Sequence, residues 1–217
     1  MKLIILGTSH IANKSIKSVK EKFEEYNPDI IALELDYSRV IALKNKVKRP
    51  KNITLLKMLG VKGFLFYIIG ELIQQKLGKI VNIQPGAEML TALRLAEKNN
   101  KKVALIDRDI QITLKRFSKH FQKREALKMV FDLIKGLFKK TELELDLTTV
   151  PSQDVIDLVL KQTKDNYPSL YKVLIDERDR YMAHKINNLT KVYPESKILA
   201  VVGAGHVKGI KRYLSKF

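Results

Sequence analysis

The sequence predicts one α/β domain over residues 1–217, with a largely parallel central sheet flanked by helices and a helical insertion in the middle. Two observations predict this class. Four short, continuous apolar runs alternate with segments whose apolar residues recur at helical spacing. Continuous runs indicate strands that are buried on both faces, as parallel strands are. No stretch has the composition of a linker, so we expect a single domain; the predicted strands span 2–6, 29–35, 102–107 and 197–202.

The chain begins with a β-α-β pattern, which is typical of a parallel sheet. The run 2–6 is the first strand, and residues 13–26 carry apolar side chains on one helical face. Pro28 then precedes the second strand, 29–35, and residues 37–47 are predicted to form the next helix.

The middle of the chain is predicted to be mostly helical. Residues 62–77 are apolar nearly all round, but the apolar core of this segment is far shorter than the ~18–20 residues that span a bilayer. A helix buried within one subunit and a helix at a subunit interface both explain the segment. We expect the interface, and therefore a homodimer or a larger assembly. A helix over 85–100 leads into the third strand, 102–107.

Helices also dominate the second half of the chain. Asp109 is placed as the N-cap of a helix over 109–117. Residues 123–140 form an amphipathic helix covered with lysines, which suits either a solvated helix or contact with a membrane surface. Helices over 151–164 and 168–193 precede the fourth strand, and a short helix closes the chain.

The composition excludes several classes of function. The chain has no cysteine, which rules out disulfides, thiolate catalysis and cysteine-based zinc sites and suits a reducing compartment. No signal peptide is recognised, so we expect a cytoplasmic protein, with membrane association left open. There are 41 Lys and Arg against 23 Asp and Glu, a net charge of +18. The basic residues are scattered without a nucleic-acid-binding motif, so we expect no nucleic acid partner.

Polar residues gather where the four predicted strands end. The tetrapeptides "GTSH" (7–10) and "GAGH" (203–206) each follow a strand, Glu34 and Asp36 end the second strand, and Asp107 with Arg108 and Asp109 ends the third. Ligands of open parallel sheets bind beyond the carboxyl ends of the strands. A lone histidine or carboxylate at a strand end is usually a cap or a salt-bridge partner, but four such ends agree here.

The chemistry of these side chains suits a divalent metal. Two imidazoles and a carboxylate with an open position can hold Zn²⁺, Mn²⁺, Co²⁺ or Fe²⁺. A second carboxylate can take a proton from water, and Arg108 could stabilise an oxyanion. There is no H-E-x-x-H motif, and Ser9 beside His10 does not make a serine triad.

Six segments in order resemble the TraB/pheromone-shutdown family, which includes PrgY-like proteins and, more distantly, the Tiki metalloproteases. They are "GTSHIANKS", "ELDYSR", "PGAEM", "LIDRDIQITLKRF", "ERDRYM" and "VVGAGHVKGI". The resemblance implies a fold similar to erythromycin esterases and ChaN-like haem-binding proteins. It also implies a divalent-metal-dependent hydrolase that acts on peptide bonds. Many members of the family continue into a C-terminal membrane-embedded region.

The resemblance also implies roles for individual residues. By motif, His10, His206 and Glu34 are the expected metal ligands, for Mn, Co or Zn. The expected catalytic residues are Glu34, Arg39, Glu88, Asp107 and Arg108, and residues 177–179 match the family's "ERD".

Three hypotheses about function follow from the sequence. We favour a metal-dependent peptidase or related hydrolase with a peptide substrate. The second hypothesis is a non-catalytic protein that binds a peptide, haem or metal at the same edge of the sheet, where the four strands end. The third is a basic protein that binds nucleic acid or a membrane surface through its lysines. Turnover of a peptide pool separates the first two, and steeply salt-dependent binding would support the third.

Overall fold

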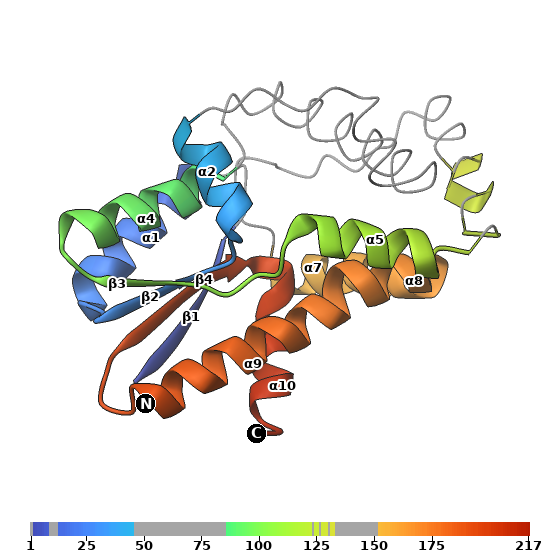
Figure 1. Cartoon of the computed structure of the whole chain (residues 1–217). Helices are drawn as coiled ribbons and strands as arrows, with labels where there is room; N and C mark the ends of the chain where they lie inside the picture. The colour runs from blue at the N-terminus through green and yellow to red at the C-terminus, as the bar shows by residue number, and fades with distance from the viewer. Residues whose placement is uncertain are drawn as a thin grey trace.

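A single parallel sheet organises the protein. The structure is a computed structural model that describes residues 2–8, 13–45, 86–122, 124–125, 127–129, 131–132 and 152–217. Within these residues four strands pair in the order β1-β4-β2-β3, and every pair is parallel (Figure 1). The predicted α/β class and parallel sheet are therefore confirmed. The strands are β1 (Leu3–Thr8), β2 (Ile30–Leu33), β3 (Lys102–Leu105) and β4 (Ile198–Gly203).

Backbone pairing between β2 and the edge strand β3 continues past the ends of both strands. The Ile106 N–H donates to the Leu33 carbonyl at 3.0 Å, and the Asp107 N–H donates to the Leu35 carbonyl at 3.3 Å. These two bonds extend the pairing as far as Asp107, although β3 itself ends at Leu105 and not at the predicted residue 107. The strand order also places the last strand between the first two, so the segments before "GTSH" and "GAGH" are direct neighbours, with Thr8 opposite Gly203.

The predicted helices in the described segments are confirmed, with small shifts at their ends. Predicted helix 62–77, and with it the proposed dimer interface, lies outside the described residues, and so does most of 123–140. No helix in the described part is long and apolar enough to cross a membrane. The named helices are α1 (Asn13–Tyr26), α2 (Tyr37–Asn45), α4 (Ala87–Lys98), α5 (Ile110–His120), α7 (Gln153–Asn166), α8 (Pro168–Tyr171), α9 (Glu177–Val192) and α10 (Val207–Leu214).

Helices cover both faces of the sheet, and the two central strands, β2 and β4, are buried at every position, whereas Lys102 and Val103 at the start of the edge strand β3 are exposed. On one face, α1 and α4 pack against the sheet, with Phe23 and Met89 among the buried side chains. On the other face, α9 and α10 pack through Met182, Ile186 and Ile210 (Figure 1). Burial on two sides anchors the strands and fixes the positions of the residues that follow them.

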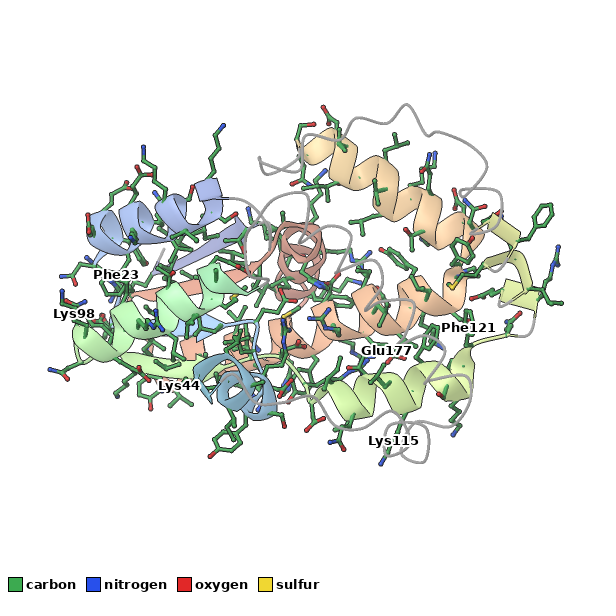
Figure 2. All side chains as sticks on the ribbon, turned by 90° about the horizontal axis from the view of Figure 1, so that it is seen from above. Phe23, Lys44, Lys98, Lys115, Phe121 and Glu177 are labelled. Atoms are coloured by element: carbon green, nitrogen blue, oxygen red, sulfur yellow. The ribbon has the colours of Figure 1, made fainter. Side chains whose placement is uncertain are left out.

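A third apolar cluster lies beyond the carboxyl ends of the strands. Phe117 of α5 and Phe121, which directly follows this helix, stack with their ring centroids 4.4 Å apart and pack on Val173. Figure 2 shows Phe23 and Phe121 toward opposite ends of the described structure, each in its own cluster. This third cluster anchors α5 against the chain that leads into α9.

The long helix predicted over 168–193 contains a π-helical turn. Residues Lys172–Asp176 form this turn between α8 and α9. A π turn widens the helix locally and is often found at functional sites. Here its carbonyl groups accept hydrogen bonds from two arginines: Arg108 donates to Val173 O at 2.9 Å, and Arg178 donates to Leu174 O at 3.3 Å.

Candidate functional site

Arg178 is the centre of a polar network at the carboxyl-end rim of the sheet. Its guanidinium binds Asp107 through two hydrogen bonds, Nε to Oδ1 at 3.1 Å and Nη2 to Oδ2 at 2.7 Å. Nη2 also donates to Glu34 Oε1, and Nη1 donates to His206 Nε2 at 3.1 Å. Burial by itself lowers the pKa of Arg178, but Glu34 and Asp107 outweigh this effect and raise the pKa above its ordinary value. Arg178 therefore stays a cation at every physiological pH.

His206 is held in one orientation by Asp179. The Asp179 Oδ1 atom lies 2.6 Å from His206 Nδ1, and both side chains are buried. Because Arg178 donates to Nε2, that nitrogen must be the unprotonated acceptor, and Nδ1 must carry the hydrogen that goes to Asp179. Burial raises the pKa of Asp179, while the hydrogen bond from His206 opposes the rise. The Nε2 lone pair of His206 is thus directed at the rim.

Glu34 lies beside His206 and is almost completely buried, with 1% of its surface exposed. Its Oε2 accepts a hydrogen bond of 2.6 Å from the backbone N–H of Gly203, at the end of the neighbouring strand. Its Oε1 lies 3.5 Å from His206 Nε2. The strand-end glutamate and the histidine of "GAGH" therefore meet, as the sequence predicted, although the contact passes through Arg178.

Two donor atoms at this rim have the spacing of two ligands of one ion, although Arg178 contacts both of them. Two tetrahedral ligands that each lie ~2.1 Å from one ion are separated by roughly 3.4 Å, close to the 3.5 Å between His206 Nε2 and Glu34 Oε1. The Oδ2 atom of Asp36 is buried on the same rim and has no hydrogen-bond donor in the part of the chain that the structure describes. An unsatisfied buried carboxylate oxygen is the kind of atom that a bound cation or ligand would engage.

The described residues do not complete a metal centre by themselves. No three His, Asp or Glu side chains among them are arranged to hold an ion. His10, the third predicted ligand, lies outside the described residues. It follows Thr8 by two positions in the chain, and Thr8 pairs with Gly203, the residue that binds Glu34. The three-ligand hypothesis thus stays a prediction.

Other predicted site residues occupy different places around the rim. Arg39 lies behind Asp107, with Nη1 3.9 Å from Asp107 Oδ2. Glu88 is buried in the first turn of α4. Asp36 caps α2 by accepting the backbone N–H of Arg39 at 2.9 Å. The structure does not bring Arg108 to the Glu34–His206 pair.

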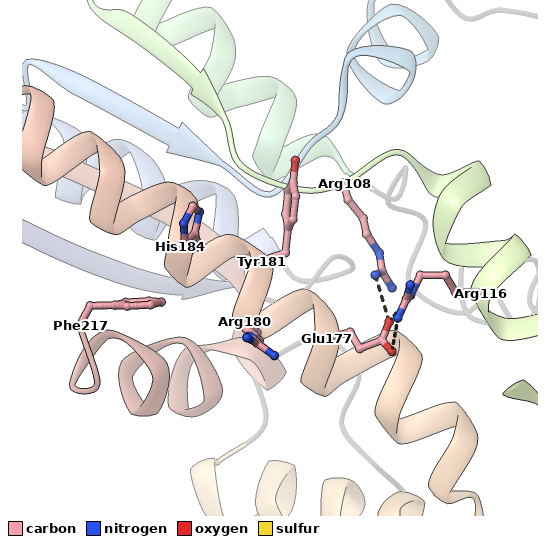
Figure 3. A pocket seen from close by; sticks show the side chains of 7 residues that line it. All are labelled: Arg108, Arg116, Glu177, Arg180, Tyr181, His184 and Phe217. Carbon is pink, nitrogen blue, oxygen red and sulfur yellow. Dashed lines mark hydrogen bonds and ion pairs between the residues drawn. The ribbon is translucent and has the colours of Figure 1, made fainter.

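Arg108 belongs instead to a neighbouring cluster around Glu177. Arg108 Nη1 donates to Glu177 Oε2 at 3.1 Å. Arg116 donates to the same carboxylate through two hydrogen bonds, from Nε to Oε2 at 2.6 Å and from Nη2 to Oε1 at 2.9 Å (Figure 3). The hydrogen bond from Arg116 is the main reason that the pKa of Glu177 falls to about 2, and Arg108 lowers it further. The Arg108 Nε also donates to Thr113 Oγ1 at 3.0 Å, so this buried side chain is fixed.

Glycines allow the backbone to pack closely around the site. A Cβ atom added to Gly209 would lie 1.8 Å from Asp179 Oδ2, so only glycine lets α10 pass beside this carboxylate. A Cβ on Gly7 would lie 2.9 Å from Val207 Cγ2 and 3.2 Å from the Cα atom of Ala204, so glycine lets these two segments pack closely. Neither Gly7, Gly203 nor Gly205 adopts a positive φ.

Arg178 and Asp179 hold the centre of the network, but the sequence alone gave them no individual roles. A signal for Asp179 was present in the helical pattern of α9. It shares the buried face with Met182, Ala183 and Ile186, at spacings of three, four and seven residues. A carboxylate on a buried helical face requires a partner, and that partner is His206.

The fold and site define a class: an α/β domain whose parallel sheet carries a Glu-Arg-His-Asp network beyond the carboxyl ends of its strands. Comparison with known families agrees with the sequence motifs. The profile of the TraB/PrgY/gumN family matches residues 1–217, and the chain belongs to this family.

Relatives extend over nearly the whole chain. A Methanocaldococcus jannaschii protein described as uncharacterized protein MJ1365 is 36% identical over 215 residues, which cover 99% of this chain and 53% of the relative. TraB domain-containing proteins of Bos taurus and Homo sapiens are each 24% identical and match 97% of this chain and 62% of their own length. The chain thus spans between half and two thirds of the length of these relatives.

Proposed function

We propose that the protein is a metal-dependent hydrolase that cleaves peptide bonds at the rim of the sheet. One observation carries the proposal: Asp179 fixes His206 so that its unprotonated Nε2 lies 3.5 Å from Glu34 Oε1, with Arg178 now contacting both atoms. A histidine that ligates a metal typically donates its other ring N–H to a carboxylate, which fixes the tautomer and the ring orientation. A buried carboxylate–histidine pair aimed at a second carboxylate has the donor set of such a site.

His206 and Glu34 would hold the ion, with His10 as the predicted third ligand. When bound, a divalent ion polarises a carbonyl group and makes water a better nucleophile near neutral pH. Asp179 keeps the Nε2 of His206 unprotonated and correctly oriented. The N–H of Gly203 holds the carboxylate plane of Glu34.

Arg178 would stabilise the negative charge that develops on the carbonyl oxygen of the substrate. We assign it this role in place of Arg108 because its guanidinium contacts both His206 and Glu34. The proton of the attacking water requires a carboxylate with a free lone pair. Asp107 accepts from Arg178 through both oxygens, whereas Asp36 Oδ2 has no donor among the described residues, so Asp36 is the better candidate base.

Metal binding and turnover can be tested separately. Elemental analysis of the purified protein and titration calorimetry with Mn²⁺, Co²⁺ and Zn²⁺ measure the first, and digestion of a peptide library with each metal measures the second. We expect His206→Ala to weaken metal binding at least tenfold and to abolish cleavage. His120→Ala is the matched control because His120 lies on α5, away from the rim. Metal binding that survives His206→Ala unchanged would refute the proposed site.

His10 can be tested through its coupling with His206. Residues that serve one chemical step give non-additive losses. We therefore expect His10→Ala and His206→Ala each to remove most activity, with the double variant little worse than either. Strictly additive losses would separate His10 from the site.

A second candidate function is non-catalytic binding at the same rim. The observation that favours it is that Arg178 already donates hydrogen bonds to His206 Nε2 and to Glu34 Oε1, the two atoms that would ligate a metal. Binding of a peptide without turnover, with any of the three metals, would support this alternative over hydrolysis.

A further inference from the structure

A separate cavity lies next to the rim network, between α5 and α9. Its volume is about 360 Å³, within the range of small-ligand pockets. Arg108 and Arg116 reach it from one side, Arg180 and Tyr181 from α9, and Phe217 lies opposite (Figure 3).

The cavity is strongly cationic. The residues that line it include three arginines, Arg108, Arg116 and Arg180, and one carboxylate, Glu177, which leaves an excess of two positive charges. Glu177 stays ionised because its pKa is lowered to about 2. Arg108 and Arg116 are both engaged with Glu177, but Arg180 has no ion-pair partner among the described residues. A positive charge is therefore left for a ligand to pair with.

The way in which Glu177 is held indicates the shape of group that these arginines prefer. Arg116 contacts its two oxygens with Nε and Nη2 at 2.6 and 2.9 Å, a forked geometry that suits a planar carboxylate. Arg108 is fixed in place by Thr113 and Val173, so this part of the cavity is preorganised. Preorganised cations bind an anion with little further loss of side-chain entropy.

The cavity and the rim network share a wall. Asp107 belongs to the rim and the next residue, Arg108, to the cavity, while Glu177 belongs to the cavity and the next residue, Arg178, to the rim. Two pairs of consecutive residues thus connect the cavity with the network around Glu34 and His206.

We propose that this cavity binds an acidic side chain of a peptide, so that the protein prefers substrates with a carboxylate near the cleaved bond. This inference rests on the proposed hydrolase function. Arg180 supplies the free cation for the carboxylate, and the rings of Tyr181 and Phe217 contact neighbouring apolar atoms of the peptide.

The test compares two blocked alanine-based hexapeptides, one with a single glutamate and one with glutamine at the same position. Their binding to the full chain is measured by calorimetry without added metal, and inorganic phosphate is titrated as a third probe. We expect the glutamate peptide to bind at least tenfold more tightly than the glutamine peptide. Arg180→Ala should weaken its binding about tenfold, the effect of one charge-assisted hydrogen bond. Lys191→Ala, an equal loss of charge on the same helix, should change binding less than twofold.

Several results would overturn the inference. Equal binding of the two peptides would do so, and so would an equal loss in Lys191→Ala, because only the overall charge would then matter. Tighter binding of phosphate than of the glutamate peptide would overturn the carboxylate assignment. Cleavage of both peptides at equal rates, without a difference in binding, would refute the acidic-peptide pocket but not the proposed hydrolase function. Binding that depends on Arg180, without cleavage by any metal-loaded sample, would support the acidic-peptide pocket but refute the proposed hydrolase function.

Discussion

Replacing Arg178 with Met should destabilise the fold strongly at pH 7. The Arg178 side chain is 16% exposed, and the carboxylates that it binds, Glu34 and Asp107, are 2% and 5% exposed. Removing the cation leaves both charges buried without their partner. Breaking a buried pair in this way costs about 3–5 kcal/mol, whereas a surface pair contributes about 0–1 kcal/mol. We expect Arg178→Met to lower the free energy of unfolding by about 3–5 kcal/mol. Arg180→Met, which changes an exposed residue without an ion pair, should lower it by less than about 0.5 kcal/mol.

Urea unfolding followed by circular dichroism measures both variants. If Arg178→Met does not fold, Arg178→Lys tests the same idea, because lysine keeps the charge but not the fork, and an intermediate loss is expected. A double-mutant cycle with Asp107→Asn isolates the pair: Arg178→Met should cost at least about 1 kcal/mol less in that background. A loss below about 1 kcal/mol in the wild-type background, or the same loss in both backgrounds, would refute the electrostatic argument.

Two further substitutions test the packing and the charge of the site. Gly209→Ala should lower the free energy of unfolding by about 1–3 kcal/mol through overpacking against Asp179, although alanine usually favours a helix by about 1 kcal/mol. Gly205→Ala, whose Cβ would meet only Leu160 at 3.9 Å, is the control, and equal melting temperatures for both variants would contradict the steric reason. Glu177→Gln should cost about 1–2 kcal/mol at pH 7. The pKa of Glu177 is depressed to about 2, so its contribution is complete above the unfolded value of ~4.3 and is lost as the pH falls through about 2. Urea midpoints at pH 7 and near pH 2 check this, and a difference between wild type and variant that persists at low pH would count against it.

The sequence predicted the four strands and their parallel arrangement from continuous apolar runs, although burial at every position holds only for the central strands β2 and β4 and not for the edge strand β3. It also predicted the N-cap at Asp109, whose side chain accepts the Gln111 N–H at 2.7 Å, because capping is a local interaction. The strand order could not be predicted, since an apolar run does not specify its neighbours. That order is what places Glu34 beside Gly203.

The choice of arginine at the rim depended on tertiary structure as well. Arg108 follows a strand directly, so its position in the sequence favoured it. Arg178 reaches the rim because α9 crosses the strand ends just after a π turn, and helical periodicity does not reveal such a turn. Local sequence patterns identified the region of the site but not which charged side chains meet there.

The arrangement of acids and bases explains why the two sequence motifs have their particular form. In the pair 107–108 the acid enters the rim and the base enters the cavity, whereas in the pair 177–178 the base enters the rim and the acid enters the cavity. Each site therefore receives one carboxylate from one motif and one guanidinium from the other. The backbone N–H of Arg108 also donates to Asp107 Oδ1 at 2.9 Å, so a hydrogen bond links the backbone of the cavity residue Arg108 to the side chain of the rim residue Asp107. Because each motif supplies both sites, a change in the position of α9 relative to the sheet would disturb the rim and the cavity together. A ligand that draws Glu177 or Arg108 toward the cavity has a direct physical route to the carboxylates around Arg178.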